Sequence, residues 1–282
     1  MFKRKKIGLV LGGGGAKGFA HIGVLKALEE NNIQIEAISG TSMGAIIGAL
    51  YCLGYSPKEI ERKIYETPWK NLIDIGFSRR GILKGDKLEK YLRKILDNKK
   101  FSDLEKPLFI NAIDIKNFEE IIFNKGDLAK AIRASISIPG IFEPVENNKR
   151  ILVDGGLIDN LPIKVLKDNK TKKILAINLE ENINIKPIYD SANIKQNKEK
   201  IPKLSEILFK SFFLIHSREL KFLLNQKDTF ILTPNTKEIK FQDFRKIKQG
   251  INLGYSETIK NMKKIKKLMK KDGFFKKVIR KT

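Results

Sequence analysis

A short uncharged run, residues 7–11, ends at four consecutive glycines and is followed by a segment with helical spacing. An apolar run bounded by glycine is typical of a buried strand in a parallel sheet. Residues 16–31 then place apolar side chains towards one side of a helix, and residues 33–39 and 45–53 repeat the order of strand and helix. This alternation predicts an α/β fold in which crossover helices join parallel strands.

The rest of the chain extends the same pattern. We predict further strands at residues 107–115, 151–153, 173–179 and 229–232, and helices at residues 86–96 and 204–224. Residues 182–202 are polar and lack an apolar period, so they predict a loop. Nothing in the composition resembles an interdomain linker. The sequence therefore predicts a single α/β domain over residues 1–282 with a mainly parallel central sheet.

The chain carries 56 Lys or Arg against 32 Asp or Glu, and its net charge is +24. Residues 237–282 hold 16 of the basic and 4 of the acidic residues. A surplus of this size favours anionic partners, although a Lys-rich genome would produce it as well. The basic residues do not alternate with aromatic ones, as they do in grooves that stack bases, so we expect no nucleic-acid binding. An anionic membrane surface remains as a candidate partner.

Cysteine content and hydropathy limit the compartment. The single cysteine, Cys52, excludes an intramolecular disulfide and favours a reducing environment. No apolar run reaches the length of a membrane-spanning helix. Residues 1–6 are basic, as at the start of a signal peptide, but the apolar run that follows is too short for secretion. We therefore expect a cytoplasmic protein whose membrane contact, where it has one, is peripheral.

The glycine loop at residues 12–18 reads G-G-G-G-A-K-G and lies between a predicted strand and a predicted helix. Gly13, Gly15 and Gly18 fit the dinucleotide-binding fingerprint, but the next strand ends at residues 39–41 without the acidic residue that this site requires. A P-loop is excluded because the lysine is neither preceded by glycine nor followed by serine or threonine. The loop also fits an oxyanion hole, in which backbone amides stabilise the negative oxygen of an acyl intermediate.

A second motif favours the oxyanion hole. Residues 40–44 read G-T-S-M-G, and this G-x-S-x-G pattern again lies between a predicted strand and a predicted helix. That context is the one a nucleophile elbow requires, in which a sharp turn presents the serine and Gly40 and Gly44 leave room for it. Ser42 is therefore the candidate nucleophile. The alternative is that Ser42 only caps the helix that follows.

A serine nucleophile needs a base, and Asp154 is the candidate. It follows the predicted strand at residues 151–153 and precedes Gly155 and Gly156. If that strand is parallel to the others, Asp154 reaches the edge of the sheet where Ser42 emerges. The alternative is an aspartate that only shapes an Asp-Gly turn.

The chain contains two histidines. His21 lies in the first predicted helix, where it could pack against the elbow as a hydrogen-bonding core residue. His216 lies in the predicted helix at residues 204–224 and would complete the chain order Ser, Asp, His of an α/β-hydrolase triad. The residues therefore leave two candidates, a dyad of Ser42 and Asp154 and a triad that adds His216.

The chain resembles the bacterial patatin-like phospholipases in blocks that follow the family's order. These blocks are residues 13–18 with 21–25, residues 40–44, residues 134–142, and residues 154–156 with 160–162. They cover a motif-bearing core at about residues 7–167, and residues 168–282 match only loosely.

The resemblance implies an α/β/α sandwich related to the α/β hydrolases. It also implies a Ser42–Asp154 dyad without histidine, an acyl-enzyme on Ser42, and an oxyanion hole from the amides near Gly13, Gly14 and Gly15. The implied activity is hydrolysis of lipid or other acyl esters without calcium, so we expect no cofactor and no metal ion.

Two other functions remain as alternatives. One is a soluble carboxylesterase or thioesterase, and the other is a regulator that binds lipid or nucleotide without catalysis. Near the end of the chain, Met262, Ile265, Leu268 and Met269 alternate with lysines. A basic amphipathic helix of this kind can lie in an anionic bilayer interface, or it can dock on the domain with its lysines in solvent.

Overall fold

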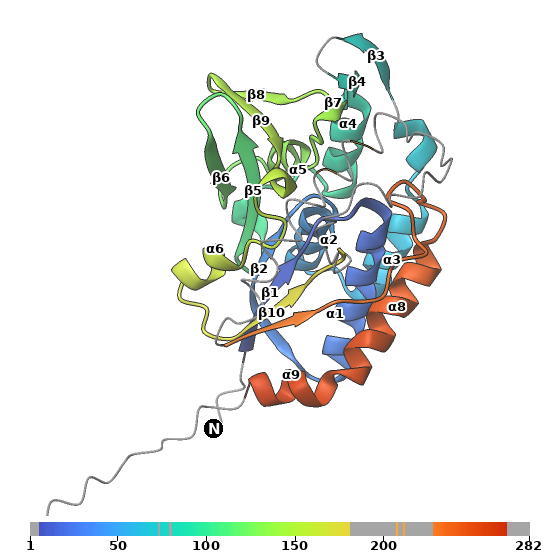
Figure 1. Cartoon of the computed structure of the whole chain (residues 1–282), viewed down its shortest axis with the longest axis vertical. Helices are drawn as coiled ribbons and strands as arrows, with labels where there is room; N and C mark the ends of the chain where they lie inside the picture. The colour runs from blue at the N-terminus through green and yellow to red at the C-terminus, as the bar shows by residue number, and fades with distance from the viewer. Residues whose placement is uncertain are drawn as a thin grey trace, which may run out of the picture.

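The computed structural model describes residues 6–72, 74–78, 81–180, 207, 211 and 228–269. A mixed sheet runs through its centre (Figure 1). In spatial order its strands are β11 (Thr229–Leu232), β10 (Ile174–Ile177), β1 (Lys6–Leu11), β2 (Gln34–Gly40), β5 (Leu108–Asp114), β9 (Arg150–Asp154) and β8 (Val145–Asn147), and β6 (Glu119–Phe123) also pairs with β5. The strands from β11 to β5 are parallel, whereas β6, β8 and β9 run antiparallel to their neighbours. The mainly parallel α/β sheet is therefore confirmed.

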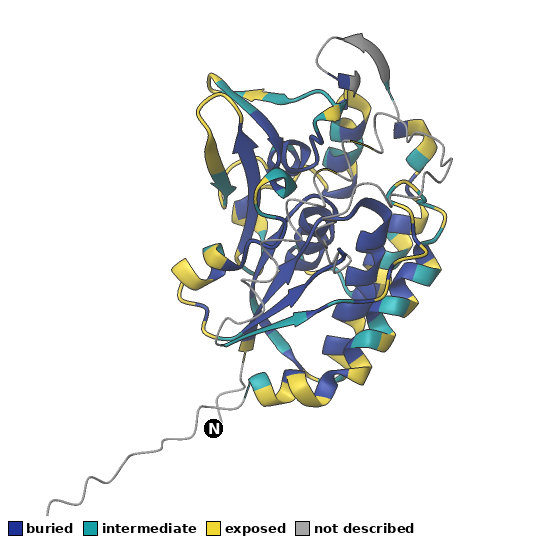
Figure 2. Ribbon diagram, in the orientation of Figure 1, coloured by how far each residue is buried: buried dark blue, intermediate teal, exposed yellow. Residues whose placement is uncertain are grey.

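Alternate residues of the central strands face two layers of helices, as the period of two in a strand dictates. In β1, Leu9 and Leu11 belong to the larger apolar core and Val10 belongs to a smaller one on the other face. The helices that contribute to the larger core are α1 (Ala20–Glu30), α2 (Met43–Cys52), α3 (Pro57–Tyr65), α4 (Asp86–Ile95), α5 (Leu128–Ser135), α8 (Ile247–Lys260) and α9 (Met262–Leu268). Helix α6 (Ile163–Asp168) covers the other face, and Figure 2 shows the buried strands between these layers.

Short elements complete the described chain. Four 3-10 helices are η1 (Gly15–Phe19), η2 (Trp69–Leu72), η3 (Phe101–Asp103) and η4 (Gly155–Leu157). A small sheet is formed by β3 (Ile75–Ser78), β4 (Gly81–Leu83) and β7 (Gly140–Phe142).

Helix α8 lies against α1 on one side of the sheet (Figure 1). The two backbones approach closely, because a β-carbon on Gly254 would lie 1.9 Å from the carbonyl oxygen of Ala20. A β-carbon on Gly23 would lie 1.9 Å from the carbonyl oxygen of Ile251. The contact therefore fixes α8, and with it the loop at residues 240–246, against the helix that follows the glycine loop.

Most predicted elements are present within a few residues. The helix predicted at 16–31 is divided into η1 and α1, because the glycine-rich start adopts a tighter turn. Helices α3, α5, α6 and α8 and strands β3, β4, β6, β7 and β8 were not predicted. Of these, α3 carries a recognisable signal, because Ser56 and Glu59 form a capping box at its start. The predicted loop at 182–202 and the predicted helix at 204–224, apart from residues 207 and 211, lie outside the described residues.

The C-terminal basic helix docks on the domain. Met262 is 7% exposed and Ile265 is fully buried in the larger core. The apolar side of α9 therefore packs against protein, as the docked alternative predicted. Within the described residues, none of the helices has the length and hydropathy needed to cross a bilayer.

Candidate active site

Ser42 lies at a strained turn between β2 and α2. Its backbone has φ 52° and ψ −119°, a conformation that side chains other than glycine rarely adopt. The Ser42 side chain makes no capping hydrogen bond to α2. The interpretation of Ser42 as a helix cap is therefore wrong, and the turn has the geometry of a nucleophile elbow.

The two glycines of the motif are required by packing. A β-carbon on Gly44 would lie 2.0 Å from the carbonyl oxygen of Leu11, and one on Gly40 would lie 2.8 Å from the carbonyl of Gly44. Real β-carbons do not come this close to backbone atoms. The glycines therefore allow α2 to start directly against the end of β1.

The glycine loop lies beside the elbow, because β1 and β2 are neighbours and Leu11 is paired with Gly40. The N–H of Gly13 donates to Oδ1 of Asn160 over 3.0 Å, so this amide is already engaged. Within the described chain, the amides of Gly14 and Gly15 have no acceptor. Of the three amides proposed for the oxyanion hole, these two are the ones open to a ligand.

Asp154 reaches the same edge by a route that differs from the predicted one. Strand β9 is antiparallel to β5, so its carboxyl end points away from the edge where parallel strands end. However, Asp154 is paired with Ala112, whereas Gly40 is level with Ile110. Strand β9 ends at Asp154 before it runs below the level of Gly40. Asp154 therefore lies about two residues, or ~7 Å, past the carboxyl end of β2, on the same side as Ser42. The expectation of a parallel strand was wrong, but Asp154 does reach the edge of the sheet where Ser42 emerges.

The end of α5 and the turn after it hold the backbones of both candidates. The Ser42 N–H donates to Oγ of Ser135 over 3.0 Å, and the Asp154 N–H donates to the carbonyl of Ser137 over 3.0 Å. Arg133 is 3% exposed and donates to Oγ of Ser137 and to three backbone carbonyls. Burial lowers the pKa of Arg133 from its usual value, although nearby acidic groups oppose that shift.

The residues around Ser42 and Asp154 form one cluster. A β-carbon on Gly13 would lie 3.3 Å from Cβ of Ser42 and 2.5 Å from Oδ1 of Asn160. A β-carbon on Gly156 would lie 3.1 Å from the same Oδ1 and 3.0 Å from Oδ1 of Asp154. Asp154 also accepts a turn hydrogen bond from the Gly156 N–H over 2.8 Å, so the turn interpretation holds together with the proximity to Ser42.

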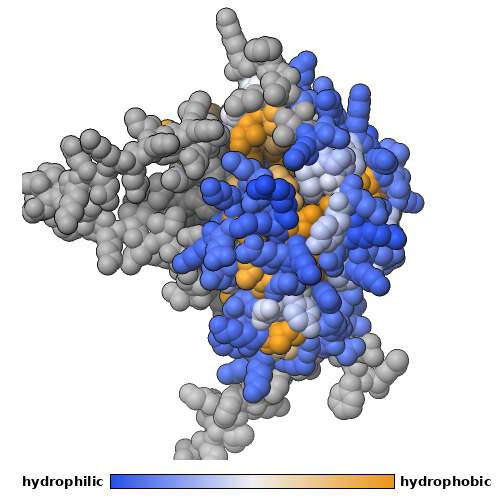
Figure 3. All heavy atoms as spheres, turned by 90° about the vertical axis from the view of Figure 1, so that its right-hand side faces the viewer, coloured by the Kyte–Doolittle hydropathy of each residue, from blue (hydrophilic) through white to orange (hydrophobic). Residues whose placement is uncertain are grey.

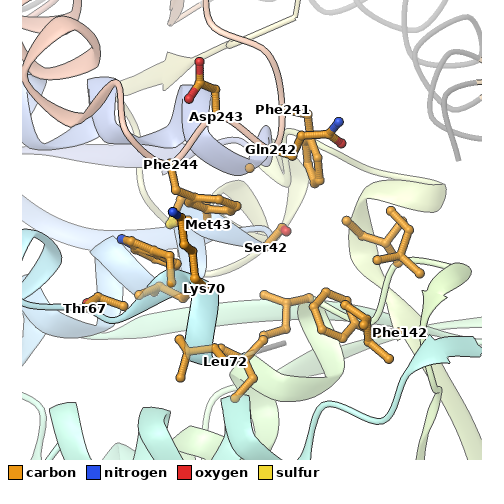
Figure 4. A pocket seen from close by; sticks show the side chains of 18 of the residues that line it. Ser42, Met43, Thr67, Lys70, Leu72, Phe142, Phe241, Gln242, Asp243 and Phe244 are labelled. Atoms are coloured by element: carbon orange, nitrogen blue, oxygen red, sulfur yellow. The ribbon is translucent and has the colours of Figure 1, made fainter. Parts of the chain in front are cut away.

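A cavity of about 870 Å³ opens beside Ser42. Gly15 and Ser42 both line it, and Asp154 is not part of the lining. Most of the wall is apolar or aromatic and comes from Met43, Ile46, Trp69, Leu72, Leu83, Leu88, Ile136, Ile138, Ile141, Phe142, Phe241 and Phe244. Figure 4 shows Ser42 between Phe241 and Phe244 on one side and Leu72 and Phe142 on the other. The site can therefore place an apolar chain next to a serine hydroxyl.

His21 is a core residue, as expected. It is fully buried, its Nε2 lies 2.8 Å from the carbonyl oxygen of Gly12, and burial lowers its pKa to about 4. His216 lies outside the described residues, so the triad alternative stays a prediction. Across the described ranges, no group of three or more His, Cys, Asp or Glu side chains is placed to hold a metal ion.

A model of the patatin-like phospholipase family matches residues 9–167, more than half of the chain. The chain belongs to the patatin-like phospholipase family. Among curated relatives, this patatin-like chain is 29% identical over 269 residues to patatin-like phospholipase domain-containing protein 6 of Mus musculus, covering 88% of this chain and 20% of the relative. It is 27% identical over 266 residues to lysophospholipase NTE1 of Saccharomyces cerevisiae, covering 88% of this chain and 16% of the relative. It therefore spans a fifth or less of the length of these relatives.

Among solved structures, the patatin-like chain is similar to VipD from Legionella pneumophila. The TM-score is 0.58 with 15% identity, and the similarity covers 93% of this chain and 67% of VipD. At that identity the likeness concerns the fold alone.

Sequence analysis of this patatin-like chain missed the residues that hold the site together. Ser135 and Asn160 lie within the blocks that resemble the family, yet only their distant contacts show what they do. Phe241 lies outside the region matched by the family model, and its carbonyl accepts from the Ala16 N–H over 2.8 Å. No local pattern carries a signal for such contacts, because each joins segments far apart in the chain.

Proposed function

We propose that this protein is a serine lipid acyl hydrolase in which Ser42 is the nucleophile and Asp154 the base. The observation that carries the proposal is the strained Ser42 turn, which lines an apolar cavity together with Gly15 of the glycine loop. Strain at a single polar residue beside a cavity is typical of functional sites. A regulator without catalysis has no need of it.

The proposed reaction has two steps. The Ser42 oxygen attacks the acyl carbonyl carbon and its proton passes to Asp154, while the Gly14 and Gly15 amides stabilise the negative oxygen. The alcohol leaves with that proton, and an ester with Ser42 remains. A water molecule then gives a proton to Asp154 and attacks this ester, which releases the fatty acid and returns the proton to Ser42.

The cavity favours a lipid acyl chain as the substrate group. Its wall is mainly apolar, so transfer of an acyl chain from water into it is favourable. The name of one relative is lysophospholipase, and a lipid with one acyl chain is therefore the first substrate to test. A soluble esterase remains the second candidate, and it predicts the highest turnover on short acyl chains.

Labelling with a fluorophosphonate probe tests the proposed chemistry. We expect covalent labelling of the wild type at Ser42 and none of Ser42→Ala, with labelling of Asp154→Asn reduced by about 10³-fold or more. Ser56→Ala is the matched control, because Ser56 lies at the start of α3 and lines no part of the cavity. Absence of labelling in the folded wild type, with detergent present, would contradict the hydrolase proposal and favour a binding role.

We extend the proposal to contact with an anionic lipid surface through the rim of the cavity. Lys70 in η2 and Lys240 in the loop at residues 240–246 are both exposed and both line the cavity. Arg245 lies at the same rim, but Asp243 pairs with it over 3.0 Å. Among the coloured residues of the face in Figure 3, hydrophilic ones predominate and hydrophobic ones form only small separate patches. Basic residues at the rim would attract such a surface electrostatically.

Co-sedimentation with vesicles tests the rim. We expect Lys70→Glu/Lys240→Glu to lose binding to phosphatidylglycerol vesicles by about 30-fold or more, since each basic residue near such a surface contributes ~1 kcal/mol and each glutamate adds repulsion. Lys248→Glu/Lys260→Glu is the charge-matched control, because both lysines are exposed on α8 and neither lines the cavity. Equal losses in both variants would show that only the net charge matters, and unchanged binding in both would contradict the membrane contact.

A further inference from the structure

The peptide unit between Gly12 and Gly13 is held on both sides by buried side chains. Its carbonyl oxygen lies 2.8 Å from Nε2 of His21, and its N–H donates to Oδ1 of Asn160 over 3.0 Å. Asn160 in turn donates from Nδ2 to Oε1 of Glu180 over 2.8 Å. His21 is fully buried, Asn160 is 8% exposed and Glu180 is 7% exposed. Two polar side chains from separate segments thus contact one peptide of the glycine loop, and a third holds one of them in place.

We propose that His21, Asn160 and Glu180 form a buried relay that orients the glycine loop and thereby aims its amides at the oxyanion. This inference rests on the proposed function, and the three residues are positioning residues that do not touch the substrate. The relay includes neither Ser42 nor Asp154, so its effect can be measured while both of those residues are intact.

On the His21 side, the chemistry of the contact fixes the state of the ring. A carbonyl oxygen can only accept, so Nε2 of His21 must carry the proton. Burial lowers the pKa of His21 to about 4, and the imidazole is therefore neutral at ordinary pH. Within the described chain, Nδ1 has no hydrogen-bond partner. The ring therefore donates one hydrogen bond, from Nε2 and not from Nδ1.

On the Asn160 side, Glu180 fixes which way the amide group faces. The Gly13 N–H can only donate, so Oδ1 of Asn160 must face it, and Nδ2 then faces Glu180 and donates to it. The same Nδ2 lies 3.4 Å from the carbonyl oxygen of Gly13. Asn160 therefore contacts both polar groups of Gly13, and Glu180 prevents the amide from turning over.

The consequence reaches the oxyanion hole through the geometry of the peptide bond. In a trans peptide the C=O and the N–H point in opposite directions. Because the Gly13 carbonyl points towards Asn160, the Gly14 N–H of the same peptide points away from it. Glycines have wide backbone freedom, so without these contacts the loop would sample other orientations. Donors fixed before the reaction are the ones that accelerate it.

Two substitutions at His21 separate this role from packing alone. The amide N–H of a glutamine side chain lies about as far from the backbone as Nε2 of histidine. The amide N–H of an asparagine side chain lies only as far as Nδ1. On a monomeric aryl ester we expect His21→Gln to keep kcat within about threefold of the wild type and His21→Asn to lose kcat by about 10- to 100-fold, as buried supporting residues do elsewhere. We expect KM to change little in both, because the cavity is untouched.

Asn160→Leu tests the other side and serves in place of His21→Asn if that variant does not fold. We expect a similar loss of kcat, and the double variant His21→Asn/Asn160→Leu to lose less than the product of the two, because both residues hold one peptide. Equal kcat for the His21→Gln and His21→Asn variants, both folded by thermal melting, would overturn the relay. A fully multiplicative double variant would overturn it too.

The outcome for the proposed function is read separately, in the wild type. Labelling of the wild type at Ser42 together with indifference of His21→Asn and Asn160→Leu would leave the hydrolase standing and refute the relay. A folded wild type that neither labels at Ser42 nor hydrolyses the ester would refute both.

Discussion

Two turns follow neighbouring parallel strands of this protein, and they expose opposite parts of the chain. After β1 the chain passes through Gly12 to Gly15 into η1, and it presents backbone N–H groups without side chains. After β2 the chain turns at Ser42 into α2, and it presents one hydroxyl while the Ser42 N–H is bonded to Ser135. One turn offers donors and the other offers a nucleophile, so their adjacency makes the site.

The two turns also owe their shapes to different forces. Hydrogen bonds hold the glycine loop: His21 donates to the Gly12 carbonyl, Asn160 accepts from the Gly13 N–H, and the Phe241 carbonyl accepts from the Ala16 N–H. Close packing of Gly40 and Gly44 against the neighbouring backbone holds the elbow. The first turn should therefore respond to changes in polarity, and the second should respond to changes in volume.

The largest effect tests the second part of that comparison. We expect Gly44→Ala to destabilise the protein by about 4 kcal/mol or more, because its β-carbon would lie 2.0 Å from the carbonyl oxygen of Leu11 and neither backbone can move freely. Urea unfolding measures this change.

Gly48→Ala, one helical turn later in α2, is the matched control. Its β-carbon would lie 3.1 Å from a methyl group of Ile38, and alanine gains ~1 kcal/mol of helix propensity over glycine. We expect the free energy of unfolding to change by less than about 1 kcal/mol. A mild effect of Gly44→Ala, equal to that of Gly48→Ala, would show that packing does not define the elbow.

The same contrast between local and distant contacts explains which elements could be predicted from the sequence. Strands with uniform apolar character, such as β1 and β10, and the two glycine-rich turns were predictable because each is specified by adjacent residues. The direction of β9 was not, because strand direction depends on pairing with β5 rather than on local pattern. The residues around Asp154 would look the same in the sequence whether β9 ran parallel or antiparallel to β5.

The supporting residues of the site were harder to predict than the candidate catalytic residues. Ser42 and Asp154 belong to short motifs whose chemistry can be named from residue types. Asn160 acts on Gly13 from 147 positions away, and Ser135 acts on Ser42 from 93 positions away. Such contacts follow from the folded topology, so a sequence read locally contains no period or spacing that marks them.

The second prediction sharpens the first turn through its dependence on pH. The pKa of His21 is lowered to about 4 by burial, whereas an unfolded histidine has a pKa of about 6.5. Between these values the unfolded chain binds a proton that the folded protein does not, so folding stability falls as pH is lowered from 6.5 to 4. At ~1.4 kcal/mol per pH unit the loss reaches about 3 kcal/mol.

His21→Gln removes this titration and keeps the contact to Gly12. We expect the difference in unfolding free energy between pH 7 and pH 4 to be smaller in His21→Gln than in the wild type by about 3 kcal/mol. Carboxylates contribute equally in both proteins and cancel. An equal change in unfolding free energy between pH 7 and pH 4 in both proteins would mean that His21 is exposed to solvent and does not hold the Gly12 carbonyl.

The third prediction concerns the strain at Ser42. Glycine adopts φ 52° at no steric cost, whereas serine and alanine do not. We expect Ser42→Gly to gain about 1 kcal/mol in unfolding free energy, since strain of ~1–3 kcal/mol is partly offset by the greater freedom of glycine in the unfolded chain. Ser42→Ala should gain nothing, and both variants should lose labelling. Equal stability of the two variants would mean that the elbow stores no strain.

The smallest effect tests the hydrogen bond that the Ser42 N–H donates to the side chain of Ser135. Ser135→Ala leaves the buried Ser42 N–H without its acceptor, and we expect a loss of about 1 kcal/mol in unfolding free energy. Ser56→Ala removes the cap of α3 at a similar cost of ~1 kcal/mol, far from the cavity. Because only Ser135 contacts the elbow, the rate of fluorophosphonate labelling should fall severalfold in Ser135→Ala and stay unchanged in Ser56→Ala. Equal labelling rates in the two variants would show that the Ser135 hydrogen bond does not position Ser42. Side-chain hydrogen bonds would then matter for the glycine loop and packing for the elbow.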